Sequence, residues 1–331
     1  MAERLADELG VRYGRAFSFT ADPRPLGGGF SSDLFEFVLD EPPAGWVGHL
    51  VLRLLPATGT KRSAVREQTI HAEVAAVAFP TAPLLLYGGA DSAFGRPYTI
   101  MPKLDGAPAV ALDGVAALKA ARQAPTLVAD TMVRLHELDA QPVVSALRER
   151  GITSEHLGVE AIWAEIEQAA TDDHALAALS VLRAGAPGPG PSVVVHGDLH
   201  ALNLWRTPDG SVVLMDWELA TVGPPELDVA RAALVFSVVP GEISRVGRPV
   251  VMRLGRRMER SFIDNYTRQR PLDTGSLAWY RALHALRLVT VVLSRPADDS
   301  VAMQWRPVAR QLAQLVESAT GVAPAVVPRA T

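Results

Sequence analysis

Three polar side chains stand out within residues 193–218 because their types and spacing suit one kind of chemistry. Asp198 follows an apolar run in VVVHGDLHALNLW, Asn203 comes five residues later, and Asp216 ends a second apolar run in VVLMDW. Carboxylate and amide oxygens suit Mg²⁺, which also binds phosphates. Phosphoryl transfer needs a carboxylate to orient a hydroxyl, and further oxygen ligands to hold metal on the nucleotide phosphates. The pattern predicts that reaction, with the three side chains meeting at the mouth of one β-hairpin.

A remote alternative uses the same segment for metal-assisted hydrolysis. His196, Asp198 and His200 form the pattern H-x-D-x-H, which could belong to a dinuclear metallohydrolase. Such a site needs further histidine or carboxylate ligands, and the other six histidines lack ligand spacing. It would also leave Asn203 without a role, so phosphoryl transfer is the favoured interpretation.

Composition excludes several other classes. The chain has 331 residues, enough for two modest domains or one bilobal unit. It contains no cysteine, which rules out disulfides and thiolate sites. A net charge of -4 argues against nucleic acid as a partner. The N-terminal stretch does not resemble a signal peptide, and no apolar run is long enough to span a membrane. We expect a cytoplasmic monomer or homodimer that does not bind membranes.

The elements that must position these side chains fall into two groups. Before residue 102, alternating or apolar runs predict strands at 34–40, 49–55, 84–89 and 97–104, a short strand before the glycine triplet 27–29, and a helix over 61–79. Beyond residue 110, three- and four-residue apolar spacing predicts helices over 110–139, 157–183, 226–238, 242–269, 276–295 and 300–320. Strands 192–198 and 211–217 are expected to form one hairpin across the PDG turn at 208–210.

The predicted fold class is therefore α+β. A small N-lobe over 1–101 would contain a five-stranded sheet and one helix. A larger, mostly helical C-lobe over 102–331 would carry the catalytic loop and the acceptor site. We expect a cleft between them, with residues 101–106 as the crossover.

HGDLHALNLW together with VVLMDWELATVGPPELDVAR resembles the catalytic loop and metal segment of the aminoglycoside phosphotransferase family. That family is related to choline kinases and more distantly to protein kinases, and the resemblance spans about residues 22–295. It implies a bilobal, protein-kinase-like fold, with Mg²⁺ and ATP or GTP as cofactor and co-substrate. By this resemblance Asp198 is the catalytic base, Asn203 and Asp216 are the metal ligands, and His196 and Asp228 are structural supports.

The resemblance extends to the nucleotide site. GGGFSSD at 27–33 is similar to the family's glycine-rich hairpin, so Gly28, Gly29, Phe30 and Ser31 are expected to approach the phosphates. Arg53 is the one basic side chain on the third strand, where protein kinases have lysine. A guanidinium still suits phosphate recognition.

Two further features complete the expected nucleotide site. We expect Arg53 to pair with a glutamate on the following helix, with Glu67 preferred and Glu73 as the alternate. YTIMPKLDG at 98–106 resembles the hinge, where adenine would bond to the backbone near Met101 and Lys103.

The acceptor is less constrained by the sequence. Candidate acceptor-site residues are Glu218, which follows the metal aspartate, and Trp279, Tyr280 and His284 on a late helix, although packing is an equal interpretation for each. The segment 242–270 is rich in arginine. If part of it lines the cleft, a neutral or acidic acceptor is favoured over a polycationic aminoglycoside. An antibiotic-inactivating kinase, a sugar or amino-alcohol kinase, and a catalytically silent nucleotide-binding protein all stay open.

Overall fold

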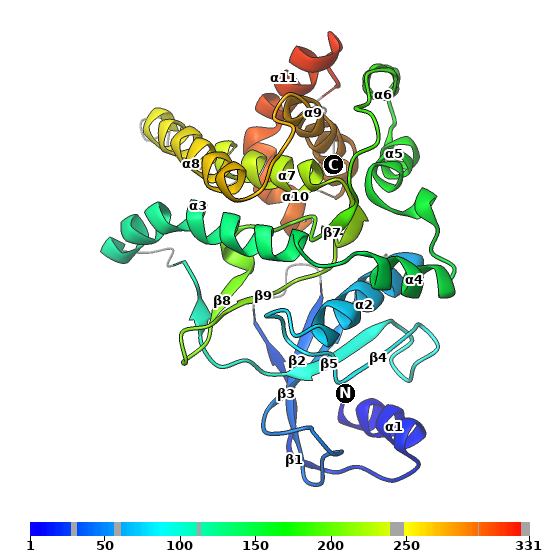
Figure 1. Ribbon diagram of the computed structural model, residues 1–331. Coiled ribbons are helices and arrows are strands. Elements are labelled where there is room, and N and C mark those ends of the chain that lie inside the picture. The colour runs from blue at the N-terminus through cyan, green and yellow to red at the C-terminus, as the bar shows by residue number, and fades with distance from the viewer. Residues whose placement is uncertain (28–31, 56–60, 111–113, 239–247, 297, 326–331) are drawn as a thin grey trace. The chain divides into compact units, whose positions relative to one another are not determined.

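The computed structural model describes residues 1–27, 32–55, 61–110, 114–238, 248–296 and 298–325 (Figure 1). The chain divides into two compact units. Unit 1 comprises residues 1–107, 145–152 and 205–220, and unit 2 comprises residues 108–144, 153–204 and 221–331.

The helices and strands are short to medium in length. The helices are α1 (Ala2–Tyr13), α2 (Lys61–Ala76), α3 (Gly114–His136), α4 (Gln141–Glu149), α5 (Gly158–Ala169), α6 (Asp173–Ala184), α7 (Pro225–Ser237), α8 (Arg248–Gln269), α9 (Leu277–Arg287), α10 (Ser300–Trp305) and α11 (Ala309–Thr320). The strands are β1 (Phe19–Leu26), β2 (Asp33–Leu39), β3 (Leu50–Leu54), β4 (Leu86–Gly88), β5 (Tyr98–Pro102), β6 (Ala107–Pro108), β7 (Val193–Val195), β8 (Leu204–Arg206), β9 (Val212–Leu214) and β10 (Thr221–Gly223).

Unit 1 is built on a five-stranded sheet in the order β1-β2-β3-β5-β4. All neighbouring strands run antiparallel. In this register Arg53 of β3 lies between Leu34 of β2 and Thr99 of β5. The five-stranded antiparallel sheet predicted from the sequence is thus confirmed.

One face of that sheet forms the core of unit 1. Successive strand residues point to opposite faces, so Leu52 and Ile100 enter the core, where they pack with Leu5 and Leu9 of α1. The N-terminal segment, to which the sequence analysis assigned no element, is therefore a helix that packs against the sheet. Arg53, one residue from Leu52, lies on the opposite face.

A buried carboxylate on α1 holds this helix against the rest of unit 1. Glu8 is 5% exposed and accepts hydrogen bonds from the Tyr98 hydroxyl at 2.7 Å and the Ala93 backbone N–H at 2.8 Å. Burial raises the pKa of Glu8, but these donors and the neighbouring Arg12 outweigh it, so the pKa is lowered overall.

Unit 2 is organised around α7. Nearly every residue of this helix is buried, as expected of a helix packed on several sides. It packs against α8 and α9, and α3 lies alongside α8 (Figure 1). The N-terminal turns of α7 carry Asp228 and Arg231, two charged side chains that are 1% and 6% exposed. Buried charges are costly unless paired, so both must have partners.

The prediction of one hairpin linking 192–198 to 211–217 is wrong. β7 pairs with β10, with Val194 opposite Val222, while β9 neighbours β8. The PDG turn joins the strands that directly flank it, because the Asp209 carboxylate accepts bonds from the Ser211 N–H at 3.1 Å and the Thr207 hydroxyl at 2.6 Å. A tight turn cannot reach back to a strand nine residues further away.

The predicted helix over 157–183 is two helices. α5 ends at Ala169, and Asp172 begins α6 by accepting a bond from the Ala175 N–H at 2.9 Å. An aspartate in this position is a strong helix N-cap. The apolar spacing therefore continues across the break between α5 and α6.

None of the helices in the described ranges is long and apolar enough to cross a membrane.

Candidate active site

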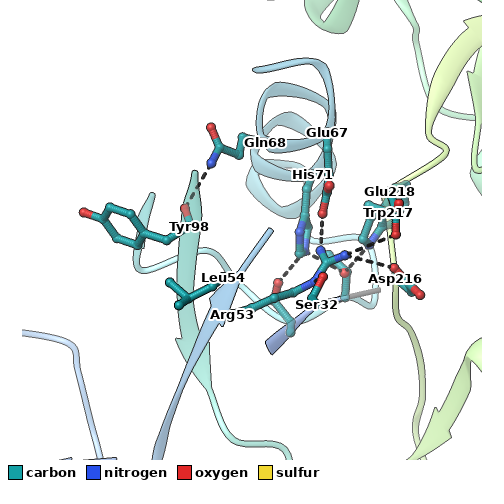
Figure 2. Close-up of polar contacts among 12 residues, drawn as sticks. Ser32, Arg53, Leu54, Glu67, Gln68, His71, Tyr98, Asp216, Trp217 and Glu218 are labelled. Carbon is teal, nitrogen blue, oxygen red and sulfur yellow. Dashed lines mark hydrogen bonds and ion pairs between the residues drawn. The ribbon is translucent and has the colours of Figure 1, made fainter. Parts of the chain in front are cut away.

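Arg53 is the centre of a charged cluster in unit 1. Its side chain is 12% exposed. Its Nε donates to the Ser32 hydroxyl at 3.0 Å, Nη1 donates to Glu67, and Nη2 donates to Asp216 Oδ1 at 3.3 Å (Figure 2). The ion pair expected between Arg53 and Glu67 is therefore formed. Burial lowers the pKa of Arg53, but Glu67 and Asp216 outweigh it and the pKa is raised, so the guanidinium stays charged.

Local structure explains why these two side chains meet. Arg53 projects from the sheet face opposite the core. On α2, Glu67 shares a buried face with Ile70 and Val74, because residues three and seven positions apart lie on one side of a helix. Burial of Ile70 and Val74 turns this face of α2 toward the interior, and Glu67 lies on the same face.

Asp216 has an unusual backbone conformation. Its φ is +65°, a left-handed value that it shares, among the described non-glycine residues, only with Ala78. For residues other than glycine this conformation is costly and clusters at functional sites. The Asp216 side chain is 49% exposed. Glu218, an expected acceptor-site residue, lies near the same guanidinium, with Oε2 3.8 Å from Arg53 Nη2.

Trp217 holds this strained segment in place. Its indole is 1% exposed, is stacked on His71 of α2 with ring centroids 5.6 Å apart, and donates through Nε1 to the Thr81 hydroxyl at 2.9 Å. Thr81 in turn donates to the Leu214 carbonyl at 3.0 Å. Trp217 is therefore a large buried anchor beside Asp216.

The expected hinge residues lie at the end of β5. Met101 is 9% exposed and faces Val51 of β3. The Lys103 N–H donates to the His49 carbonyl at 2.9 Å, so a purine would have to use other backbone groups of this segment. The Lys103 ammonium donates to Glu36 at 2.8 Å.

Glu36 carries a strongly perturbed carboxyl. Lys103 lowers its pKa most, burial opposes this, and Arg24 and His49 lower it further, to about 2. Four charged or titratable side chains thereby tie β1, β2, β3 and the hinge together.

The glycine-rich hairpin falls partly outside the described residues. This applies to Gly28, Gly29, Phe30 and Ser31, which stay predictions. Ser32, the next residue, is described and bonds to Arg53.

In unit 2, the loop after β7, which the sequence predicts to be the catalytic loop, is held by Asp228. Its Oδ1 accepts the Gly197 N–H and its Oδ2 accepts the His196 N–H, each at 2.7 Å. His136 Nε2 lies 3.2 Å from the same Oδ2. Burial would raise the pKa of Asp228, but His136 and these bonds lower it. These are the contacts expected of a residue that braces the loop.

Asp198 directly follows His196 and Gly197, the two residues whose backbone N–H groups bond to Asp228. Gly197 has φ +79°, which glycine adopts without strain. Asn203 Nδ2 donates to the Asp198 carbonyl at 3.0 Å. Burial raises the pKa of Asp198, but the charge of Arg231 and then His200 hold it well below its usual range.

Arg231 is a contact that the sequence did not reveal. It donates through Nε and Nη2 to Asp198 Oδ1 at 3.2 and 2.9 Å. The available signal was its position three residues after Asp228, which puts both side chains on one face of α7.

The metallohydrolase pattern has no support in the described residues. His200 Nε2 lies 3.5 Å from Asp198 Oδ2, but His196 Nδ1 accepts the Asp198 N–H at 3.3 Å and its residue is fully buried. Across the described parts of the chain, no three His, Asp or Glu side chains gather in a way that could hold a metal ion.

The three late-helix candidates for the acceptor site have packing contacts. Trp279 Nε1 donates to the Leu182 carbonyl at 2.8 Å, and Tyr280 is 4% exposed. His284 is bonded to the Leu227 carbonyl at 2.8 Å, and burial, followed by the charge of Arg231, lowers its pKa to about 3. Their role at an acceptor site stays a prediction, and the packing interpretation accounts for every contact described.

Comparison with known proteins adds independent information. The chain matches the model of the phosphotransferase enzyme family over residues 22–272. No curated protein matches it. A Ralstonia eutropha JMP134 protein assigned as an aminoglycoside phosphotransferase is 21% identical, with a TM-score of 0.61, over 97% of this chain and 98% of that one.

Two further solved structures share the fold. Aminoglycoside phosphotransferase APH(4)-Ia in a ternary complex with AMP-PNP and hygromycin B is 19% identical, with a TM-score of 0.58, over 97% of this chain and 98% of that one. Ethanolamine kinase from Plasmodium vivax is 13% identical, with a TM-score of 0.59, over 90% of this chain and 84% of that one. The resemblance noted in the sequence is thus confirmed. The chain belongs to the phosphotransferase enzyme family.

Proposed function

We propose that the protein is a small-molecule kinase that moves the γ-phosphoryl group of ATP, or of GTP, to a hydroxyl of its acceptor, with Mg²⁺. The observation that carries this proposal is the Arg53 cluster, in which the basic residue expected at the phosphates lies against both its glutamate and the expected metal ligand, Asp216. That arrangement combines a phosphate-binding cation with a metal-binding carboxylate, which is the electrostatic core of phosphoryl transfer.

The reaction has a simple balance. The acceptor oxygen forms a bond to the γ-phosphorus while the bond from that phosphorus to the β,γ-bridging oxygen breaks. The electron pair of the broken bond leaves with the nucleoside diphosphate, and the hydroxyl proton is released. Asp198 orients the hydroxyl and accepts this proton, directly or on its way to water. Because its pKa is low, orientation is the larger part of its contribution.

The nucleotide phosphates are assigned to unit 1 residues. Arg53 carries the positive charge, Glu67 fixes its direction, and the 27–31 loop supplies backbone N–H groups. Each of the three guanidinium nitrogens already donates a hydrogen bond: Nε to Ser32, Nη1 to Glu67 and Nη2 to Asp216. Phosphate oxygens would therefore compete with Asp216 for Nη2, the longest of the three contacts.

Asp216 and Asn203 have the chemistry that a magnesium site requires. Magnesium usually takes one or two carboxylates together with substrate phosphates and water. The Asp216 side chain is half-exposed, and the Asn203 bond to the Asp198 carbonyl uses the amide nitrogen and not the oxygen that would bind a metal. When bound, Mg²⁺ would neutralise charge on the phosphates as the diphosphate leaves.

Two acceptor classes remain within this reaction. Antibiotic inactivation is one, since related structures include aminoglycoside and macrolide phosphotransferases, and a sugar or amino-alcohol metabolite is the other. Asp198 is already paired with Arg231, and Arg253, Arg256 and Arg257 are exposed on α8. If these arginines line the acceptor site, a neutral or acidic acceptor is favoured over a polycation.

Nucleotide binding and turnover should be tested separately. Thermal unfolding with and without Mg-ATP or Mg-GTP measures binding. Release of ADP or GDP in a screen of nucleosides, macrolides, aminoglycosides and amino alcohols identifies the acceptor. Asp198→Asn should abolish transfer while leaving nucleotide stabilisation nearly intact.

The outcomes separate the alternatives. Stabilisation by Mg-nucleotide without turnover on any acceptor would favour the silent nucleotide-binding protein. Near-native turnover by Asp198→Asn would show that the assigned base is wrong.

A further inference from the structure

Arg231 is a buried cation that the reaction described above does not use. It lies on α7, three residues after Asp228, and its side chain is 8% exposed. Both its Nε and its Nη2 donate to one atom, Asp198 Oδ1. A charged group this deeply buried is retained only where its pairing is good, and here the partner is the proposed base.

A second contact fixes the guanidinium from another side. The Arg231 guanidinium carbon lies 5.0 Å from the centroid of the Trp305 ring, on α10. Trp305 is itself 5% exposed. A cation over an indole face is attracted by the ring and restricted in its rotamers, so Arg231 is held between the ring and the carboxylate.

The consequence for Asp198 is an asymmetry between its two oxygens. Oδ1 accepts two donors from Arg231, while the only contact described for Oδ2 is the 3.5 Å approach of His200 Nε2. A carboxylate with one oxygen held by a planar guanidinium loses its freedom to rotate. Oδ2 is then the oxygen left for an acceptor hydroxyl.

We infer that Arg231 is a positioning residue for phosphoryl transfer: held by Trp305, it locks Oδ1 of Asp198 so that Oδ2 alone receives the acceptor hydroxyl. This inference rests on the proposed role of Asp198. Arg231 touches neither nucleotide nor acceptor in this scheme, so its loss should change the chemical step and leave nucleotide affinity unchanged.

The test compares kcat with KM for ATP in Arg231→Ala and Arg231→Lys, using Mg-ATP and the acceptor identified by the screen, or water if hydrolysis alone is measurable. Arg231→Ala should lower kcat about a hundredfold, the cost of a misplaced catalytic group, with KM for ATP unchanged within about twofold. Arg231→Lys, which keeps the charge but not the planar fork, should fall between Arg231→Ala and the wild type.

Chemical rescue separates positioning from general loss of packing. Guanidinium chloride should restore part of the kcat of Arg231→Ala at concentrations that do not unfold it, whereas urea, the neutral molecule of the same shape, should not. A matched control is Arg287→Ala, which removes another partly buried ion pair in unit 2, with Glu165 at 2.6 Å. It should lower stability without changing kcat.

Each outcome decides the matter. A kcat for Arg231→Ala near the wild-type value, rescue by urea as good as by guanidinium, or an equal loss in Arg287→Ala would overturn the inference. If Arg231→Ala does not fold, Arg231→Lys is the test. A folded lysine variant with wild-type kcat would also overturn the inference. A wild-type protein with no turnover at all would overturn the proposed function itself, which distinguishes the two failures.

Discussion

Replacement of Asp228 by asparagine removes the carboxylate charge that holds the proposed catalytic loop, while keeping the size of the side chain. The carboxylate now accepts the Gly197 N–H at Oδ1 and the His196 N–H at Oδ2, each at 2.7 Å, and His136 Nε2 lies 3.2 Å from Oδ2. An asparagine side chain has only one acceptor oxygen. Either the His196 N–H or the Gly197 N–H must therefore lose its acceptor and lie against the amide NH₂ group instead.

The magnitude follows from these contacts. Leaving one buried backbone N–H without an acceptor costs about 1–3 kcal/mol, and exchanging a charged acceptor for a neutral one weakens the remaining bonds by about 1 kcal/mol. We expect Asp228→Asn to lower the free energy of unfolding by about 2–4 kcal/mol, a large share of the total for a typical protein. The loosened loop should also lower kcat.

Urea unfolding followed by circular dichroism measures the free-energy change, provided the slope m is unchanged. Asp172→Asn is the matched control, because Asp172 caps α6 through one bond to the Ala175 N–H, and asparagine caps as well as aspartate. The reasoning is refuted if Asp228→Asn loses less than about 1 kcal/mol, or if the control loses as much.

Three other changes test separate parts of the structure. Asp216→Ala should weaken binding of Mg-nucleotide by about tenfold or more, seen as a smaller thermal shift with Mg-ATP; an unchanged shift would remove Asp216 from the metal site. Gly106→Ala should destabilise the protein by more than about 2 kcal/mol, because φ is +131° and an added Cβ would lie 2.1 Å from the Arg206 carbonyl oxygen; a wild-type melting temperature would contradict this. The pKa of Glu36 is lowered from 4.5 to about 2, so its contribution to stability is present above pH 4.5 and lost as the pH falls toward 2. The difference in melting temperature between wild type and Glu36→Gln should shrink over that range, and a constant difference would argue against the ionised carboxylate.

Much of the local structure could be predicted from the residues alone. Alternation along β3 puts Leu52 in the core and Arg53 on the other face, and the predicted helix over 61–79 contains Glu67, the preferred partner of Arg53. Both are short-range patterns, in which the geometry of one element decides where its side chains point.

The strand pairing could not be predicted in the same way. The Val193–Val195 run reads as a buried strand, but nothing in it specifies β10 as its neighbour. Pairing between strands distant in sequence depends on tertiary packing, here on α7, which directly follows β10, and on the bonds of Asp228 in that helix to the loop after β7.

The sequence by itself determined the reaction class, because the residue types in HGDLHALNLW and VVLMDWE and their spacing restrict the chemistry. It also predicted the five-stranded sheet and, through the family resemblance, Glu67 as the preferred partner of Arg53. Only the tertiary structure decided what surrounds Asp198: Arg231, 33 residues further along the chain, on its Oδ1, and Trp305, 74 residues beyond Arg231, against the guanidinium. Contacts between distant side chains depend on how whole helices pack, and no local periodicity encodes that packing.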